Sequence, residues 1–321
     1  MPSDRKLLVL GATGFVGRTV CRLLDERGRD YTGSSLSAGV DLRDETQAIA
    51  LFKQTQPEYV LNCAAFVGGI QFGYDHPGEI FRNNLPMSVN ILESCRQTGV
   101  KRLVNPISNC AYPARATLFK ESEFWEGPLH ESVMVYGMAR KMSWVGAWAY
   151  NKQYGVDIIS LILSNMYGPG DHFDPVRSHA LGALIKKMVD AKEQSAPFVT
   201  VWGTGKPVRE WLFVEDGAEA IIRALEIEPY LDPINIGVAQ GVSIKELANM
   251  IKSQVGYEGE LRFDLTKPDG AAFKTVDGSQ GKKLLGWQPK IGLQEGIRQT
   301  VQWYLTDADR LAVASTGHEF N

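Results

Sequence analysis

A glycine-rich segment near the N-terminus constrains the fold of this chain more than any other feature. Residues 11–17 read Gly-Ala-Thr-Gly-Phe-Val-Gly and stand between an apolar run, Leu7–Leu10, and an amphipathic segment, Arg18–Arg27. The first glycine permits a tight turn, the second lets backbone approach a pyrophosphate, and the third lets a helix pack close to the strand. A strand, a glycine turn and a helix in this order predict a dinucleotide site. The alternative is a tight strand–helix turn that binds no ligand.

Apolar stretches alternate with helical patterns through the first half of the chain. Buried strands that are each followed by a helix predict an α/β fold with a Rossmann-like, doubly wound parallel sheet. Right-handed crossovers then place a ligand at the carboxyl ends of the strands. The predicted strands are residues 29–33, 59–62, 102–107 and 156–162, and the predicted helices are 18–27, 45–54 (capped by Asp44), 82–97 and 135–153.

The pattern becomes mixed after Asn165, which indicates a second, smaller lobe. We expect residues 1–165 to form an NAD(P)-binding Rossmann domain, with the segment from about 210 to 240 returning to it. Residues 166–321 would then form mainly a mixed α/β substrate lobe. Its predicted elements are helices at 179–192, 216–226 and 243–255, strands at 199–201, 234–236 and 260–263, and a helical tail over 281–304.

Composition excludes several classes of partner. The chain has 321 residues and a formal net charge of −3, so no basic face for nucleic acid or an anionic membrane is expected. The sequence has no visible signal peptide and no apolar run of membrane-spanning length, and we expect a cytoplasmic protein. The cysteines form no CxxC pair and no metal-ligand spacing, so we expect free thiols and no metal. They are Cys21, Cys63, Cys95 and Cys110.

The end of the second predicted strand bears on the choice of cofactor. An acidic residue usually stands there in NAD-binding versions of this fold and holds the ribose 2′-hydroxyl. Here residues 33–35 read Gly-Ser-Ser, which removes a repulsion against a 2′-phosphate. NADP(H) is therefore favoured, although no arginine stands at this position to hold the phosphate, and NAD(H) is the alternative.

Three residues further along could carry out ketone chemistry. Ser108 follows a predicted strand, and Tyr136 and Arg140 lie four residues apart on a predicted helix, so they share a face. This set resembles the Ser…Tyr-x-x-x-Lys set of the extended short-chain dehydrogenase/reductase family. There the tyrosine exchanges a proton with a carbonyl, the serine hydrogen-bonds to that oxygen, and the lysine binds the nicotinamide ribose. Here arginine replaces the lysine, and the adjacent Lys141 should point about 140° away from Tyr136. The alternative is a core tyrosine and a turn serine.

Longer motifs narrow the resemblance to the GDP-L-fucose synthases within that family. The similarity runs from about residue 5 to 310. It implies an epimerase-reductase that converts a GDP-4-keto-6-deoxy-mannose-type substrate to GDP-L-fucose by 3,5-epimerisation and NADPH-dependent reduction of the 4-ketone. The matching segments are residues 64–70, 108–113, 165–173, 178–179, 201–210, 267–270 and 285–304.

The resemblance gives a second role to two residues. In these enzymes a cysteine two residues after the serine and a histidine on the lobe-connecting segment exchange protons at carbons 3 and 5. Cys110 and His179 occupy those positions. Protons next to a ketone are acidic once Ser108 and Tyr136 polarise its oxygen, and inversion needs an acid and a base on opposite faces. The alternatives are a small buried cysteine and a histidine at a helix start.

The resemblance also implies the binding residues and a homodimer formed through the helices at 82–97 and 135–153. Arg209 and Lys187 would bind the GDP phosphates, and Trp202 would stack near guanine or the sugar. Further predicted substrate contacts are Asn165, Asp269 and Lys274. Predicted cofactor contacts are Gly11, Thr13, Gly14, Phe15, Val16, Gly17, Asp41, Leu42, Ala64, Ala65, Tyr136, Arg140, Leu163, Met166 and His179.

Two departures from the family pattern keep other functions open. Arg140 replaces the lysine, and Pro106 precedes Ile107 and Ser108 where the family often has small residues. One alternative is a related nucleotide-sugar 4-ketoreductase or epimerase that acts on another deoxysugar or a heptose. The other is a protein that binds a dinucleotide and a nucleotide sugar without turnover.

Overall fold

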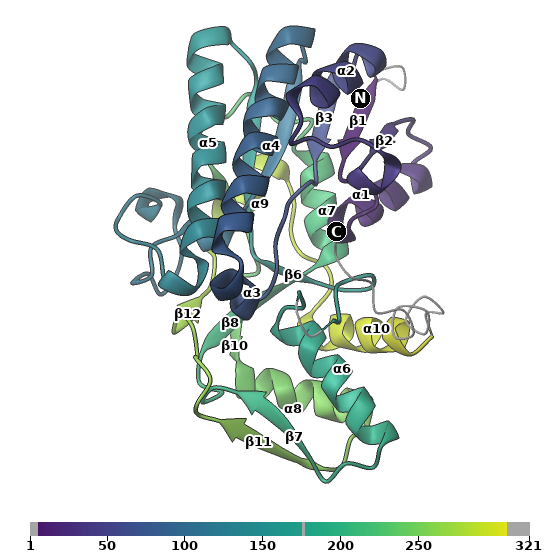
Figure 1. The fold of residues 1–321 in the computed structure, drawn as a ribbon, viewed down its shortest axis with the longest axis vertical. Coiled ribbons are helices and arrows are strands. Elements are labelled where there is room, and N and C mark those ends of the chain that lie inside the picture. Colours follow the sequence, from purple (N-terminus) through teal and green to yellow (C-terminus); the bar gives the residue numbers. More distant parts are fainter. Residues whose placement is uncertain (1–5, 175–176, 307–321) are drawn as a thin grey trace.

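A six-stranded parallel sheet forms the larger lobe of the protein, as the computed structural model shows (Figure 1). The model describes residues 6–174 and 177–306. The strand order β2-β1-β3-β4-β5-β9, in which every pair is parallel, confirms the predicted α/β fold with a doubly wound sheet. The strands are β1 (Leu7–Leu10), β2 (Thr32–Ser34), β3 (Tyr59–Asn62), β4 (Arg102–Ser108), β5 (Ile158–Leu163) and β9 (Ile234–Ile236).

Helices cover both faces of this sheet, because successive strand residues are apolar on both sides. Leu7 and Val9 of β1 pack with α1 and α7, whereas Leu8 and Leu10 pack with α2, α4 and α5. A strand buried on both faces is typical of parallel sheets. The long helices α4 and α5 lie side by side on the outer face (Figure 1). The helices are α1 (Phe15–Glu26), α2 (Glu45–Thr55), α4 (Pro77–Thr98), α5 (Met134–Tyr154) and α7 (Val214–Arg223).

The smaller lobe is built around β8, at the bottom of Figure 1. This strand pairs with β10 on one side and β12 on the other, and β6 extends it toward the large sheet. A separate pair, β7 with β11, closes the lobe. Its elements are β6 (Asn165–Tyr167), α6 (Ala180–Glu193), β7 (Phe198–Trp202), β8 (Val208–Phe213), β10 (Gly241–Ser243), α8 (Ile244–Val255), β11 (Glu260–Asp264), β12 (Phe273–Lys274) and α10 (Leu293–Thr306).

Shorter elements connect the lobes, and the chain crosses between them more than once. After the smaller lobe begins at β6, α7 returns to pack on α1 and β9 joins the edge of the large sheet. The short elements are η1 (Leu36–Ala38), α3 (Ile70–Asp75), η2 (Asn109–Ala111), η3 (Glu121–Glu123), η4 (Glu131–Val133) and α9 (Ser279–Leu285). Among the described residues, no helix is both long and apolar enough to cross a membrane.

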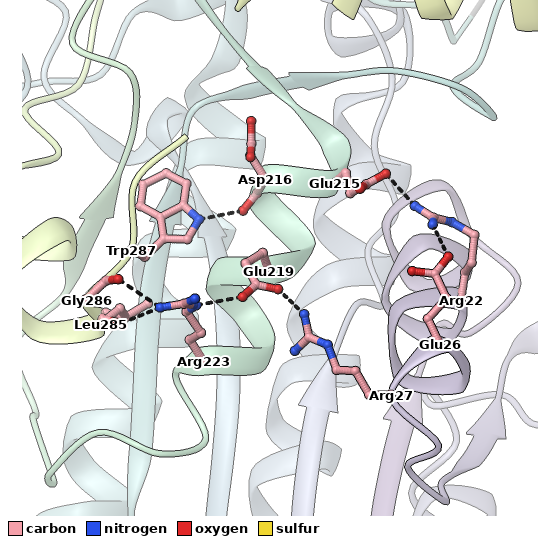
Figure 2. Close-up of polar contacts among 10 residues, drawn as sticks. All are labelled: Arg22, Glu26, Arg27, Glu215, Asp216, Glu219, Arg223, Leu285, Gly286 and Trp287. Carbon is pink, nitrogen blue, oxygen red and sulfur yellow. Dashed lines mark hydrogen bonds and ion pairs between the residues drawn. The ribbon is translucent and has the colours of Figure 1, made fainter. Parts of the chain in front are cut away.

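Polar contacts orient α7 against α1 and against the end of α9 (Figure 2). Arg22 of α1 pairs with Glu215 of α7 at 2.6 Å. Glu219 accepts from Arg223 at 2.6 Å, and Arg223 donates to the carbonyl of Gly286 at 2.8 Å. Such exposed ion pairs contribute little free energy each, so the buried apolar contacts hold α7 while these pairs set its orientation.

Several predicted boundaries were wrong for local reasons. Helix α4 begins at Pro77 rather than residue 82. Proline fits the first turn of a helix, because an N–H at that position makes no hydrogen bond within the helix. The predicted helical tail is two helices, α9 and α10. Gly286 ends α9 in the left-handed conformation at φ +55°. Strand β2 begins at Thr32 rather than residue 29, and α7 begins and ends two to three residues early, at Val214 and Arg223.

Candidate active site

The glycine turn rests directly on the end of β3. Gly11 has φ +71°, and a Cβ there would lie 2.8 Å from the backbone nitrogen of Ala64. A Cβ on Gly17 would lie 2.0 Å from the carbonyl oxygen of Gly11, so α1 packs against the turn as expected. Gly14 caps α1, and its missing Cβ would meet only the Gly11 oxygen. The side facing the start of α1 is therefore open, and the residues fit a pyrophosphate there.

Hydroxyl groups rather than charges line the end of β2. The hydroxyls of Thr13 and Ser37 are 2.9 Å apart, and Ser35 accepts a hydrogen bond from the Ala38 amide. Asp41, a predicted cofactor contact, pairs with Arg43: the Arg43 Nε donates to the Asp41 Oδ1 at 2.8 Å. This guanidinium holds the pKa of Asp41 below its usual range. Sequence reasoning missed Arg43, whose guanidinium pairs with Asp41.

Ser108 and Cys110 belong to a turn that contacts the start of α5, the helix that carries Tyr136. Ser108 ends β4 and caps η2, and its Oγ accepts from the Cys110 amide at 3.2 Å. A Cβ on Gly137 would lie 2.2 Å from the carbonyl oxygen of Cys110, so only glycine allows this approach. The residue that follows Tyr136 thus brings α5 against the turn that carries the thiol.

Pro106 fits in the middle of β4 without the loss of a ladder hydrogen bond. The amides of even-numbered residues in β4 point toward β3, as Arg102 does when it donates to Glu58. The pairing with β3 ends at Val104. The missing N–H of Pro106 therefore faces a side where the ladder has already ended.

Arg140 occupies the family's lysine position and contacts the tyrosine. Its Nε donates to the Tyr136 hydroxyl at 3.2 Å, and Arg140 is buried. The predicted direction of Lys141 is confirmed: its Nζ donates to the Phe124 carbonyl and lies 4.4 Å from the centre of the Trp125 ring. Lys141 therefore stabilises the 121–125 segment and does not substitute for the family lysine.

His179 caps α6 beside the loop that precedes α3. A Cβ on Gly69 would lie 2.6 Å from the carbonyl oxygen of Ser178, which holds the two segments together. The surrounding protein lowers the pKa of His179 below its usual range, and the charges of Lys274 and His172 lower it further. The His179 side chain is nevertheless exposed, so it can contact a ligand.

Arg209 and Lys274 lie side by side on two neighbouring strands. They are register partners in the parallel pair of β8 and β12, so their side chains share a face. Arg209 donates to the carbonyls of Val208 and Asp269, and burial lowers its pKa to about 10. Lys274 is buried, and its Nζ lies 3.5 Å from the Cys110 sulfur.

The other predicted substrate contacts lie in the smaller lobe. Trp202 is 44% exposed, with the Nζ atoms of Lys187 and Lys267 each 5.1 Å from its ring centre. The carboxylate of Asp269 accepts from the amide and hydroxyl of Thr204, both at 2.7 Å, and so holds the loop that follows Trp202.

The remaining predicted contacts lie on the framework of the site. The side chain of Asn165 donates to the Glu210 carbonyl at 2.9 Å. Leu163 ends β5, and Met166 of β6 packs against Gly217. The other predicted cofactor contacts lie near the strand ends. Phe15 and Val16 begin α1, Leu42 lies between η1 and α2, and Ala65 lies between β3 and α3.

Two further residues of the site, besides Arg43, escaped sequence reasoning. His130 lies near Lys274 and Arg209, whose charges lower its pKa in addition to desolvation. Glu210 is fully buried and accepts from the amides of Val238 and Val276. Glu210 follows Arg209 in the matched motif, which was the only available signal, and no pattern marked His130.

Comparisons place the chain among known proteins. Residues 7–237 match the NAD dependent epimerase/dehydratase family. GDP-L-fucose synthase 1 of Arabidopsis thaliana is 39% identical over 94% of this chain and 93% of its own length. A GDP-6-OMe-4-keto-L-xylo-heptose reductase from C. jejuni superposes with a TM-score of 0.88 at 28% identity, over 95% of this chain and 99% of that one.

A further solved structure is a GDP-L-fucose synthetase from Naegleria fowleri bound to NADP. It superposes with a TM-score of 0.86 at 29% identity and covers 95% of this chain and 94% of its own. The fold, the site and these similarities agree, and the chain belongs to the GDP-L-fucose synthase group of the NAD dependent epimerase/dehydratase family.

Proposed function

We propose that this protein is an NADP(H)-dependent epimerase-reductase that converts a GDP-4-keto-6-deoxy-mannose-type substrate to GDP-L-fucose. The larger lobe would bind the cofactor and the smaller lobe the GDP-sugar. The observation that carries the proposal is that Ser108 and the thiol of Cys110 share one turn, which contacts the helix that carries Tyr136. A simple ketoreductase needs the serine and the tyrosine but not the thiol.

Reduction of the ketone would use Tyr136 as the proton donor. NADPH, when bound, supplies the hydride to the carbonyl carbon. The Tyr136 hydroxyl gives its proton to the carbonyl oxygen, and the Ser108 hydroxyl hydrogen-bonds to that oxygen. Arg140 places a positive charge beside the phenol oxygen as the proton leaves.

Epimerisation would precede reduction and use Cys110 and His179. With the carbonyl oxygen polarised, a carbon–hydrogen bond next to it breaks, its proton goes to one of the two side chains, and its electron pair enters an enolate. The other side chain returns a proton to the opposite face of the carbon. The lowered pKa of His179 favours its neutral imidazole, which can accept the proton that leaves the carbon.

The departures at Arg140 and Pro106 favour one second candidate. The similarity to a GDP-heptose reductase, with a TM-score of 0.88, supports a C4 reductase that acts on another GDP-sugar. A separating assay supplies NADPH with either GDP-4-keto-6-deoxy-D-mannose or a GDP-4-keto-heptose, and identifies products by NMR. GDP-L-fucose from the first substrate supports the main proposal, and turnover of the heptose alone would replace it with the second. Binding of both ligands without any turnover would point to the non-catalytic alternative.

An apolar face on α4 and α5 supports a homodimer as part of this proposal. Phe81 and Val89, eight residues apart on α4, are 58% and 55% exposed, and Met138 and Met142, four apart on α5, are 41% and 47% exposed. These spacings place each pair on one helix face. The two helices pack side by side, so the four side chains can form one surface for a second copy of the chain.

A further inference from the structure

We propose that Lys274 is a positioning residue for Cys110, an inference that rests on the proposed function. Its ammonium group would stabilise the negative charge left on the sulfur when Cys110 gives its proton to the substrate, while His179 accepts the proton that leaves. Lys274 and Cys110 are 164 positions apart in the sequence, yet the Lys274 Nζ lies 3.5 Å from the Cys110 Sγ. An ammonium group at this distance donates to sulfur and stabilises a negative charge on it.

The backbone directs this side chain inward. Lys274 ends the two-residue strand β12 and is buried, whereas its neighbour Phe273 is 43% exposed. Pairing with Arg209 of β8 fixes the register of β12, and the side chains of paired residues point to the same face. Lys274 therefore reaches the thiol from a fixed strand and not from a surface loop.

The titratable groups around Lys274 in the described part of the chain offer it no free carboxylate, so the Cys110 sulfur is the partner we assign to its ammonium group. His130 and His179 face it as imidazoles whose pKa values are lowered, and Arg209 is a second cation. The Asp269 carboxylate is engaged by Thr204. Within residues 6–174 and 177–306, Lys274 forms no ion pair with a carboxylate, and its Nζ donates to the Cys110 sulfur.

Alkylation by iodoacetamide tests the pair without turnover. The thiolate sulfur forms a bond to carbon and iodide leaves, so the rate follows the thiolate fraction. Burial raises the pKa of the other three thiols, Cys21, Cys63 and Cys95, so Cys110 should react first. Mass spectrometry of peptides assigns the label, and Cys110→Ser confirms the assignment.

We expect Lys274→Met to slow Cys110 alkylation at pH 7 roughly tenfold. Lys274→Arg keeps a cationic donor and should retain most of the rate. Lys282→Met is the matched control, because Lys282 is an exposed lysine in the last turn of α9 and its loss should leave alkylation unchanged. Thermal unfolding of each variant checks that it is folded. If Lys274→Met does not fold, Lys274→Gln is the second neutral variant and should slow alkylation by a similar factor.

The catalytic readout separates this role from phosphate binding. In Lys274→Met we expect deuterium exchange at carbons 3 and 5 to slow as alkylation does, with the KM for the GDP-sugar changed less than kcat. Unchanged alkylation with a raised KM would overturn the proposal and leave Lys274 as a phosphate ligand. If Cys110 of the wild-type protein is alkylated rapidly but the protein does not turn over the substrate, the role of Lys274 toward Cys110 stands and the proposed function is rejected.

Discussion

The Nε atom of Arg140 donates a hydrogen bond to the hydroxyl oxygen of Tyr136 across 3.2 Å. The tyrosine oxygen is the acceptor, so its own hydrogen is free to be donated to a substrate carbonyl. The guanidinium carbon of Arg140 also lies 5.4 Å from the centre of the Tyr136 ring. Arginine at the family's lysine position therefore still places a positive charge at the phenol oxygen, although its planar fork differs from an ammonium.

Removal of this charge should slow ketone reduction. We expect Arg140→Met to lower kcat for NADPH consumption roughly 10²-fold, because the tyrosine then loses a positively charged partner as it gives up its proton. Arg140→Lys should stay within about tenfold of the wild type, since an ammonium can serve the same oxygen. Lys152→Met, in the last turn of the same helix, controls for loss of charge. Equal rates in Arg140→Met and the wild type would contradict a role for this contact.

The hydroxyl-lined end of β2 should bind the 2′-phosphate of NADPH, and an added carboxylate there should weaken that binding. Ser37 is exposed and contacts Thr13, so Ser37→Asp places a negative charge at this end of the site. We expect NADPH to bind about fivefold more weakly, from roughly 1 kcal/mol of repulsion, while NADH binding changes little. Fluorescence titration measures both affinities, and Ser37→Asn is the uncharged control. Weakening of NADH by the same factor would mean that the 2′-phosphate lies elsewhere.

Asp171 should make stability depend on pH. Burial raises its pKa to about 7, and within the described residues its Oδ2 has no hydrogen-bond partner. The folded state favours the protonated form. Its stabilising effect is therefore complete below about pH 4, near the unfolded pKa, and is lost as the pH rises through about 7.

Asp171→Asn removes this loss and should stabilise the protein at pH 8 by roughly 1–4 kcal/mol. At pH 5 the gain should be smaller. Denaturant midpoints at the two pH values measure the effect, and the exposed Asp232→Asn is the control. A gain of the same size at both pH values would contradict the assignment to Asp171.

A charge on the exposed apolar face of α5 should disrupt the proposed homodimer. Met142→Glu would place a carboxylate opposite its copy or against apolar side chains across a two-fold interface, and we expect a monomer in light scattering at micromolar concentration. Leu265→Glu, at a residue of the smaller lobe that is 72% exposed, should leave the dimer intact. A wild-type monomer would exclude the interface.

The fold class could be predicted because its signals are local. The glycine turn needs glycine for local reasons, which are a positive φ at Gly11 and a close approach at Gly17. The alternation of apolar runs with helical patterns predicts the parallel strands. The direction of Lys141 followed from helical geometry alone. Element ends were less predictable: Pro77 starts a helix although proline usually breaks one, and Gly286 divides the predicted tail.

The site could be predicted only in part, because its contacts join distant segments. Resemblance grouped Lys274 with the nucleotide-binding residues, but only the pairing of β12 with β8 brings it to Cys110. Likewise, no pattern in the sequence places His130 near Lys274. The roles assigned to Ser108, Cys110, Tyr136 and His179 stay predictions that kinetics must test.

One measurement tests the central claim most directly. The purified protein is mixed with NADPH and GDP-4-keto-6-deoxy-D-mannose in deuterated water, with absorbance at the reduced-cofactor band and NMR of the product as readouts. We predict loss of NADPH and GDP-L-fucose with deuterium at carbons 3 and 5, and Cys110→Ala should lose the deuterium. NADPH loss without deuterium would contradict epimerisation and indicate a simple 4-ketoreductase, and no loss of NADPH with no deuterium would contradict the proposed function altogether.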